Sequence, residues 1–141
     1  ALLAWSGLGP VCTAGILAEI QDTRRFLEGC KFDKKLHEFR PKVAWDGQAA
    51  VAKFAGLWWP RKQSGKFESE DRHLCKQSNA YLRYYLLEGA DSVRRNTAEY
   101  GAYYQRKYDE SKKHKHWRAL VLTARKMVRP IFALLAKYQT A

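Results

Sequence analysis

One serine stands in a basic loop whose composition suits chemistry on a phosphate. Ser64 is followed by Gly65, and Arg61, Lys62 and Lys66 flank the pair. A serine hydroxyl is a weak nucleophile until its surroundings activate it. Cations beside it would stabilise the charge that grows on a phosphate under attack, and the glycine would let the backbone come close. Taken alone, these residues indicate a basic loop containing a serine, and most serines in such loops have no catalytic role.

A second candidate for phosphate contact is the glycine-rich turn near the start of the chain, which reads WSGLGPVCTAGILAEI. An apolar residue, Gly7 and Gly9 in a tight turn, and then an amphipathic helix form the pattern of a helix-hairpin-helix element. Free N–H groups at the start of the helix would point at a phosphate, with the helix dipole behind them. Pro10 has no N–H, so Val11 and Cys12 are the expected donors. A plain helical hairpin with a glycine turn is the alternative.

The charge of the chain is large, positive and unevenly placed. The formal net charge is +12, with a pI near 9.8. The first 60 residues carry eight Lys/Arg against six Asp/Glu, whereas the remaining residues carry 18 against eight. A balance of this size favours a polyanionic partner, contacted mainly by the second half of the chain. A generic basic surface is the alternative interpretation.

Metal and disulfide chemistry are weakly supported by the sequence. Three cysteines without a CxxC pair argue against a zinc site and a disulfide framework, and suit a reducing cytoplasm. Glu68, Glu70 and Asp71 could hold a divalent ion, but adjacent loop acids are more often solvated. His114 and His116 lie among lysines, where contact with phosphate or solvent is expected rather than metal binding. No apolar run is long enough for a membrane span.

Aromatic residues are numerous and have two candidate roles. Trp58 and Trp59 precede Pro60 and could stack on bases; we expect one of the two rings inside the core and one outside. Four tyrosines (Tyr100, Tyr103, Tyr104 and Tyr108) cluster on adjoining helical turns and indicate packing. The arginine and histidine set that a tyrosine recombinase needs is not evident.

Periodicity and capping residues predict an all-α fold in one domain over 1–141. The expected parts are a helix-hairpin-helix element at about 1–26, a long basic loop at 57–78 and a helical bundle at 79–138. Expected helices span 11–20, 47–54 with Asp46 as cap and Gly56 at the end, 79–93 capped by Ser78 or Asn79, 97–108, and a final helix kinked at Pro130. The final helix should bury Trp117, Leu120, Val121, Ala124, Val128, Ile131, Leu135 and Tyr138, with Arg118, Arg125, Lys126 and Arg129 on other faces. The segment 30–45 has no clear structure, and a short hairpin could form within the long loop.

These pieces together resemble the C-terminal domain of the insertion-sequence family 110/116/902 transposases, also called bridge recombinases. The matching pieces, which extend over nearly the whole chain, are GLGP (7–10), LAEI (17–20), RF (25–26), FAGL (54–57), Pro60, QSGK (63–66), Arg72, Lys76, Asn79, LR (82–83) and ARK (124–126). The chain departs from the family in an apparent insertion around Lys31–Trp45 and in the acids of 68–71.

The resemblance implies roles for residues and partners. Ser64 would be the nucleophile that joins covalently to DNA. The expected DNA contacts are Gly7, Gly9, Val11, Cys12, Arg61, Lys62, Lys66, Arg72, Lys76, Asn79 and Arg83. An N-terminal RuvC-like domain, absent from this chain, would supply acidic ligands for a divalent metal such as Mg²⁺, so the fragment alone should be inactive. A structured guide RNA, a homo-oligomer and a cytoplasmic location are also implied, with no membrane. The rival functions are a non-catalytic helix-hairpin-helix module and an RNA-binding module.

Overall fold

The described part of the chain is mostly helical, as the sequence predicts. The computed structural model describes residues 2–60, 63–64, 67–68 and 73–140, with the backbone alone at 63–64, 67–68 and 140. Its α-helices are α1 (Pro10–Ile20), α2 (Ala44–Phe54), α3 (Ala80–Asn96), α4 (Ala98–Glu110) and α5 (Lys115–Thr140), with short 3-10 turns η1 (Leu2–Ala4) and η2 (Thr23–Phe26). The all-α fold class is therefore confirmed.

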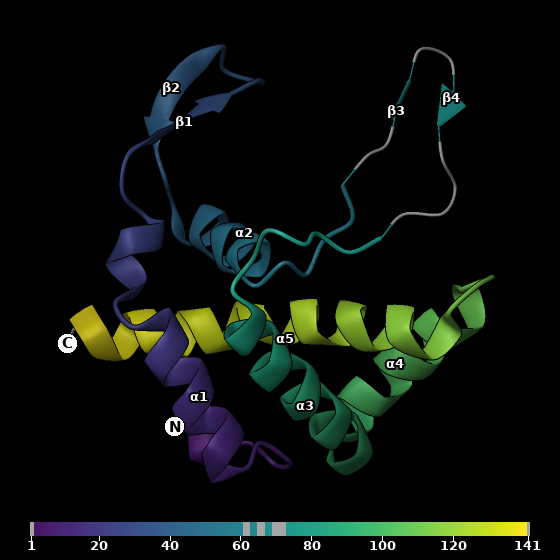
Figure 1. Ribbon diagram of the computed structural model, residues 1–141. Helices are drawn as coiled ribbons and strands as arrows, with labels where there is room; N and C mark the ends of the chain where they lie inside the picture. Colours follow the sequence, from purple (N-terminus) through teal and green to yellow (C-terminus); the bar gives the residue numbers. More distant parts are fainter. Residues whose placement is uncertain (1, 61–62, 65–66, 69–72, 141) are drawn as a thin grey trace.

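Two small antiparallel hairpins interrupt the helices. Strands β1 (Cys30–Asp33) and β2 (Glu38–Pro41) pair with Lys31 opposite Arg40, and β3 (Gln63–Ser64) pairs with β4 (Phe67–Glu68). Figure 1 shows both hairpins on the side of α5 that carries α2. The first hairpin lies in the segment 31–45, where the sequence suggests an insertion relative to the family. The second is the short hairpin expected within the long loop.

Helix α5 is the centre of the core. It crosses the molecule and packs against α2, α3 and α4 (Figure 1). Val121, Ala124, Val128 and Phe132 are fully or almost fully buried along it. The helix continues through Pro130. Trp117 and Tyr138, predicted to face inward, are exposed instead. Both lie near the ends of a 26-residue helix. At 1.5 Å per residue such a helix spans about 39 Å and extends past its neighbours.

Side chains that accept hydrogen bonds from backbone amides mark the start of several helices. Asp22 caps η2 and Asn79 caps α3 by accepting from the amides of Arg24 and Leu82, and Asn79 is one of the two cap residues predicted for α3. Asp46 was predicted to be the cap residue of the next helix, and this is wrong. The helix α2 begins at Ala44, and the Asp46 carboxylate accepts from the Val43 amide (3.1 Å) from inside the first turn.

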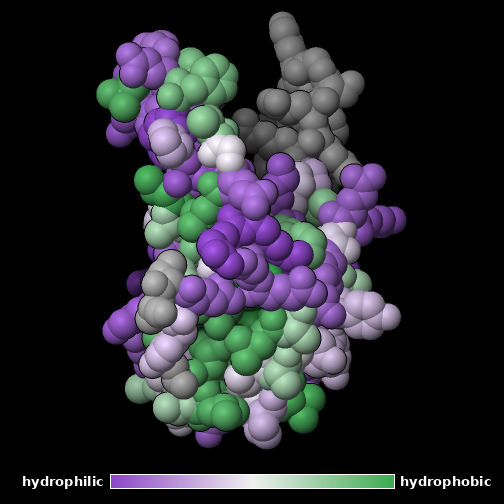
Figure 2. Space-filling view, turned by 90° about the vertical axis from the view of Figure 1, so that its left-hand side faces the viewer, coloured by the Kyte–Doolittle hydropathy of each residue, from purple (hydrophilic) through white to green (hydrophobic). Residues whose placement is uncertain are grey.

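Helix α1 is apolar on nearly all sides. Ile16 and Ile20 are buried, while Val11 (72% exposed) and Leu17 face outward. Figure 2 shows hydrophobic residues gathered on the lower half of the face where α1 lies, below a hydrophilic band. Among the described residues, no helix is both long and apolar enough to cross a membrane.

Candidate nucleic-acid interface

Ser64 lies at the tip of the second hairpin. It is the last residue of β3, and its backbone pairs with that of Phe67 in β4. Figure 1 shows this hairpin projecting away from the helices. The proposed phosphate contacts Arg61, Lys62, Lys66 and Arg72, and the acids Glu70 and Asp71, lie outside the described residues.

The two ends of the long loop are clamped together where they leave α2 and enter α3. The Asn79 amide donates to the Phe54 carbonyl (2.8 Å), and the Cys75 amide donates to the Trp58 carbonyl (3.1 Å). Gly56 has a φ of +71°, and a Cβ there would lie 2.4 Å from the Ser78 Oγ. Only glycine fits this left-handed, crowded position without strain. We call these contacts the neck of the loop.

Two predicted DNA contacts, Asn79 and Arg83, are bonded within the neck. The Asn79 side chain accepts from the Leu82 amide (2.9 Å) and donates to Glu19 Oε2 in α1 (2.6 Å). The Arg83 guanidinium donates to the Cys75 carbonyl (3.0 Å). Both side chains are half-buried. Both side chains are thus bonded to protein groups, whereas Lys76 of the same segment is exposed; whether Asn79 and Arg83 contact DNA stays a prediction.

The two glycines of the N-terminal turn have different surroundings. Gly7 has a φ of +92°, and a Cβ there would meet the Ser92 carbonyl oxygen and the Val93 Cα at 3.0 Å. Gly9 is exposed, adopts an ordinary φ of −68° and would have no heavy atom within 4 Å of an added Cβ. Gly7 is thus required for packing on α3, and Gly9 is the more open position of the two.

The start of α1, proposed as a phosphate cradle, is open to solvent. Gly9, Pro10 and Val11 are exposed, and Cys12 is half-buried. Burial, followed by the nearby Glu88, raises the pKa of the Cys12 thiol. The helix contains no lysine or arginine, so its attraction for an anion would rest on backbone N–H groups and the helix dipole.

Neither tryptophan of the loop is fully inside or outside the core, contrary to the expectation of one buried and one exposed ring. Trp58 and Trp59 are both half-buried. The Lys53 ammonium lies 5.7 Å from the Trp58 ring centre, and the Arg118 guanidinium lies 5.2 Å from that of Trp59. The rings therefore join the neck to α2 and α5, since each packs partly against protein and partly against a cation.

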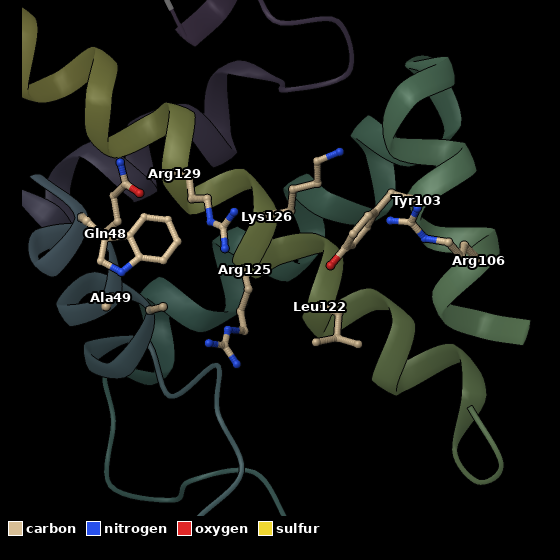
Figure 3. Close-up of a pocket in the computed structure, with 10 residues that line it drawn as sticks. Gln48, Ala49, Tyr103, Arg106, Leu122, Arg125, Lys126 and Arg129 are labelled. Carbon is tan, nitrogen blue, oxygen red and sulfur yellow. The ribbon is translucent and has the colours of Figure 1, made fainter. Parts of the chain in front are cut away.

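A cationic pocket lies between α2, α4 and α5, and it was not predicted from the sequence. Its volume is about 420 Å³, and it is lined by Trp45, Gln48, Ala49, Ala52, Tyr103, Arg106, Leu122, Arg125, Lys126 and Arg129. Figure 3 shows the three cations of α5 lying between Gln48 and Ala49 on one side and Tyr103 and Arg106 on the other. The only signal in the sequence is spacing: each helix contributes residues three or four apart, which share a helical face.

The tyrosine cluster is a packing element, as its spacing indicates. Tyr100 and Tyr104 are buried, and Tyr103 and Tyr108 are half-buried. Burial, with a contribution from Glu99, raises the pKa of Tyr100 to about 12. A phenol in this state does not become a nucleophile near neutral pH.

In the described part of the chain, the side chains considered as metal ligands are not grouped into a common site. The Nδ1 of His116 bonds to the hydroxyl of Tyr104 (2.7 Å), and His114 is exposed. No three His, Cys, Asp or Glu side chains are grouped to hold an ion in the described ranges. The three cysteines are free thiols.

Comparison with known proteins finds one family model that matches part of the chain. Residues 41–105 match the model of the Transposase IS116/IS110/IS902 family. This segment runs from the end of β2 into α4 and contains the neck, the Ser64 hairpin and part of the cationic pocket. The resemblance seen in the sequence is therefore confirmed for this segment, and the match supports a transposase function with DNA as a partner. No curated protein and no solved structure gives a match.

Proposed function

We propose that this domain presents Ser64 to a DNA phosphodiester as the nucleophile of a transposase. The observation that carries the proposal is the position of Ser64 at the end of β3, inside the segment that matches the family. The clamped neck supports it, because a tethered tip with an ordered base can be aimed by the helices below it. Orientation of a nucleophile contributes much of the rate in such reactions.

The reaction is a transesterification that needs no external energy source. The Ser64 Oγ forms a bond to phosphorus while the bond from phosphorus to one deoxyribose oxygen breaks. The serine proton is transferred to the departing deoxyribose oxygen, which leaves as a free hydroxyl. Arg61, Lys62, Lys66, Arg72 and Lys76 would neutralise the charge on the phosphoryl oxygens. The start of α1, at Gly9, Val11 and Cys12, would hold a second phosphate through backbone N–H groups as a helix-hairpin-helix element does.

The remaining parts of the reaction belong to other polypeptide segments. No grouping of metal ligands occurs among the described residues, so no step is assigned to a metal on this domain. We propose that a RuvC-like domain supplies the carboxylates for Mg²⁺, that the active protein is a homo-oligomer in the cytoplasm, and that a structured RNA guides it. The domain alone is then expected to bind nucleic acid and leave it uncut.

The test uses the transposase that carries both domains. Ser64→Ala should abolish strand exchange and the covalent protein–DNA adduct, while DNA affinity changes less than about twofold. Ser6→Ala, at an exposed serine in the N-terminal turn, is the matched control and should exchange strands normally. Recombination by Ser64→Ala at the wild-type rate would refute the nucleophile and leave a non-catalytic binding module. Competition between duplex DNA and structured RNA at several salt concentrations distinguishes a DNA module from an RNA module.

A further inference from the structure

The pocket between α2, α4 and α5 carries more positive charge than the carboxylates of the described residues compensate. No carboxylate within the described ranges pairs with Arg125 or Arg129, and Arg106 only approaches Glu110 at 4.0 Å. Lys126 is the one lining cation with a close acidic partner among the described residues, Glu99 at 2.7 Å. No acid lines the pocket itself. Cations gathered this closely repel one another, so an anion that bound among them would relieve that repulsion.

Aromatic rings form two walls of the same pocket. Trp45 is 58% exposed, and the Arg129 guanidinium lies 4.8 Å from its ring centre. The Tyr103 ring has Lys126 at 4.8 Å and Arg106 at 5.3 Å. A large exposed indole is costly for a surface with no ligand, because apolar area stays in water. Aromatic rings beside cations suit a ligand that has both a flat ring and a negative charge.

Small residues of α2 make the hollow. Ala49 and Ala52 follow Trp45 at four and seven positions, on the same helical face, so no bulky side chain fills the space beside the indole. Arg125 and Arg129 are likewise four apart on α5. The volume of about 420 Å³ lies at the lower end of the range of ligand pockets, roughly 300–1,000 Å³. A single nucleotide fits this space, whereas a double helix does not.

We propose that this pocket binds one unpaired nucleotide of a single-stranded nucleic acid. The phosphate contacts the guanidinium groups of Arg125 and Arg129, and the base stacks on Trp45. In a duplex both faces of each base are covered by neighbouring base pairs, so only an unstacked base can present its face to the indole. The pocket does not include Ser64, and this inference goes beyond the proposed function.

The test measures binding of fluorescein-labelled oligonucleotides to the 141-residue chain by anisotropy at fixed salt. The probes are a 12-nucleotide oligo-dT, a 12-nucleotide oligo-rU and a duplex of the same length. Stacking on an aromatic ring contributes roughly 1–3 kcal/mol per base, which is about 5- to 150-fold in affinity. Trp45→Leu should therefore weaken oligo-dT or oligo-rU binding by that factor, and change duplex binding less than about twofold. Trp45→Phe, which keeps a ring, should recover most of the loss.

Matched controls separate the pocket from general effects of ring and charge. Trp117→Leu makes the same substitution at an exposed tryptophan outside the pocket and should leave all three affinities unchanged. The double variant Arg125→Gln/Arg129→Gln should lower the salt slope for single strands by about 0.7, since both guanidinium groups contact one phosphate. The double variant Lys34→Gln/Lys35→Gln removes the same charge from the β1–β2 turn and should lower the slope by less.

Two outcomes of these measurements would contradict the proposal. Equal losses on single strands and duplex for Trp45→Leu would mean a phosphate site without base stacking. Equal effects for the arginine and lysine double variants would mean a diffuse basic surface. A stronger wild-type affinity for oligo-rU than for oligo-dT would assign the nucleotide to RNA, and the reverse order would assign it to DNA. Neither order affects the test of Ser64, because that test scores an adduct and strand exchange.

Discussion

Asn79 tests whether the neck of the loop is built by side-chain bonds or serves as a nucleic-acid contact. Its substitution by alanine removes two interactions that the structure shows, the cap on the Leu82 amide and the bond to Glu19. Loss of a cap costs about 0.5–2 kcal/mol. A hydrogen bond to a charged group contributes about 1.5–3 kcal/mol, toward the lower end here because Glu19 is half-buried. We therefore expect Asn79→Ala to lower the free energy of unfolding by about 2–3 kcal/mol.

In a chain of this length, each 1 kcal/mol shifts the melting temperature by about 3–4 °C, so the expected fall is about 6–12 °C by circular dichroism. Asn79→Ser is the informative partner variant, because serine also caps helices but cannot reach Glu19 with an amide donor. Asn79→Ser should lose only the contribution of the hydrogen bond to Glu19, about 1–2 kcal/mol. A double-mutant cycle with Glu19→Ala should return a coupling energy of the same size.

The binding measurement decides between the two roles. If Asn79 anchors the neck, duplex affinity of Asn79→Ala at 10 °C, far below its melting point, should stay within about twofold of wild type. Lys76→Ala should weaken binding and reduce the salt slope by about 0.9. Our reasoning would be refuted by an alanine variant that melts within about 2 °C of wild type and loses duplex affinity as Lys76→Ala does.

Two further predictions concern stability. Gly7→Ala should destabilise the fold by about 1–3 kcal/mol, because the positive φ of Gly7 and its contact with α3 both disfavour a side chain. Gly9→Ala, the control, should cost no more than about 1 kcal/mol. Equal melting temperatures of the two variants would contradict the packing described for the turn. Asp46 accepts from Arg40 and Lys31, which hold the pKa of its carboxyl well below the usual range. This lowered pKa adds stability that is complete above the unfolded value near 3.9 and is lost as the pH falls. The melting temperature of the wild type should therefore drop more steeply than that of Asp46→Asn between about pH 5 and pH 3, and parallel curves would rule out this role.

Local signals were sufficient to place α1 and the start of α3. Pro10 at the first turn and apolar residues up to Ile20 place α1 correctly, because both act within the helix itself. Asn79 marks the start of α3 for the same reason. The end residues of α5 were misjudged because periodicity describes one helix and says nothing of where its neighbours stop.

Structure that depends on distant partners could not be predicted in this way. The β1–β2 hairpin exposes both of its phenylalanines, Phe32 and Phe39, so no alternation toward a core marks it as a strand pair. The hairpin is joined to α2 by ion pairs from Lys31 and Arg40 to Asp46, and the Asp46 residue is only 5% exposed. The cationic pocket is similar, since three helices must first be packed before their faces meet.

The pieces that carry the family resemblance gain a physical meaning from the neck. The Phe54 carbonyl accepts a hydrogen bond from the Asn79 backbone amide, and Gly56 packs against Ser78. Leu57 and Leu82 are fully buried. These residues position the loop and would not touch a phosphate. This sequence pattern therefore indicates an ordered neck from which the β3–β4 hairpin projects. If the tip acts on DNA, changes in the neck should alter the rate of strand exchange without altering the affinity for DNA, and changes among the loop cations should alter both.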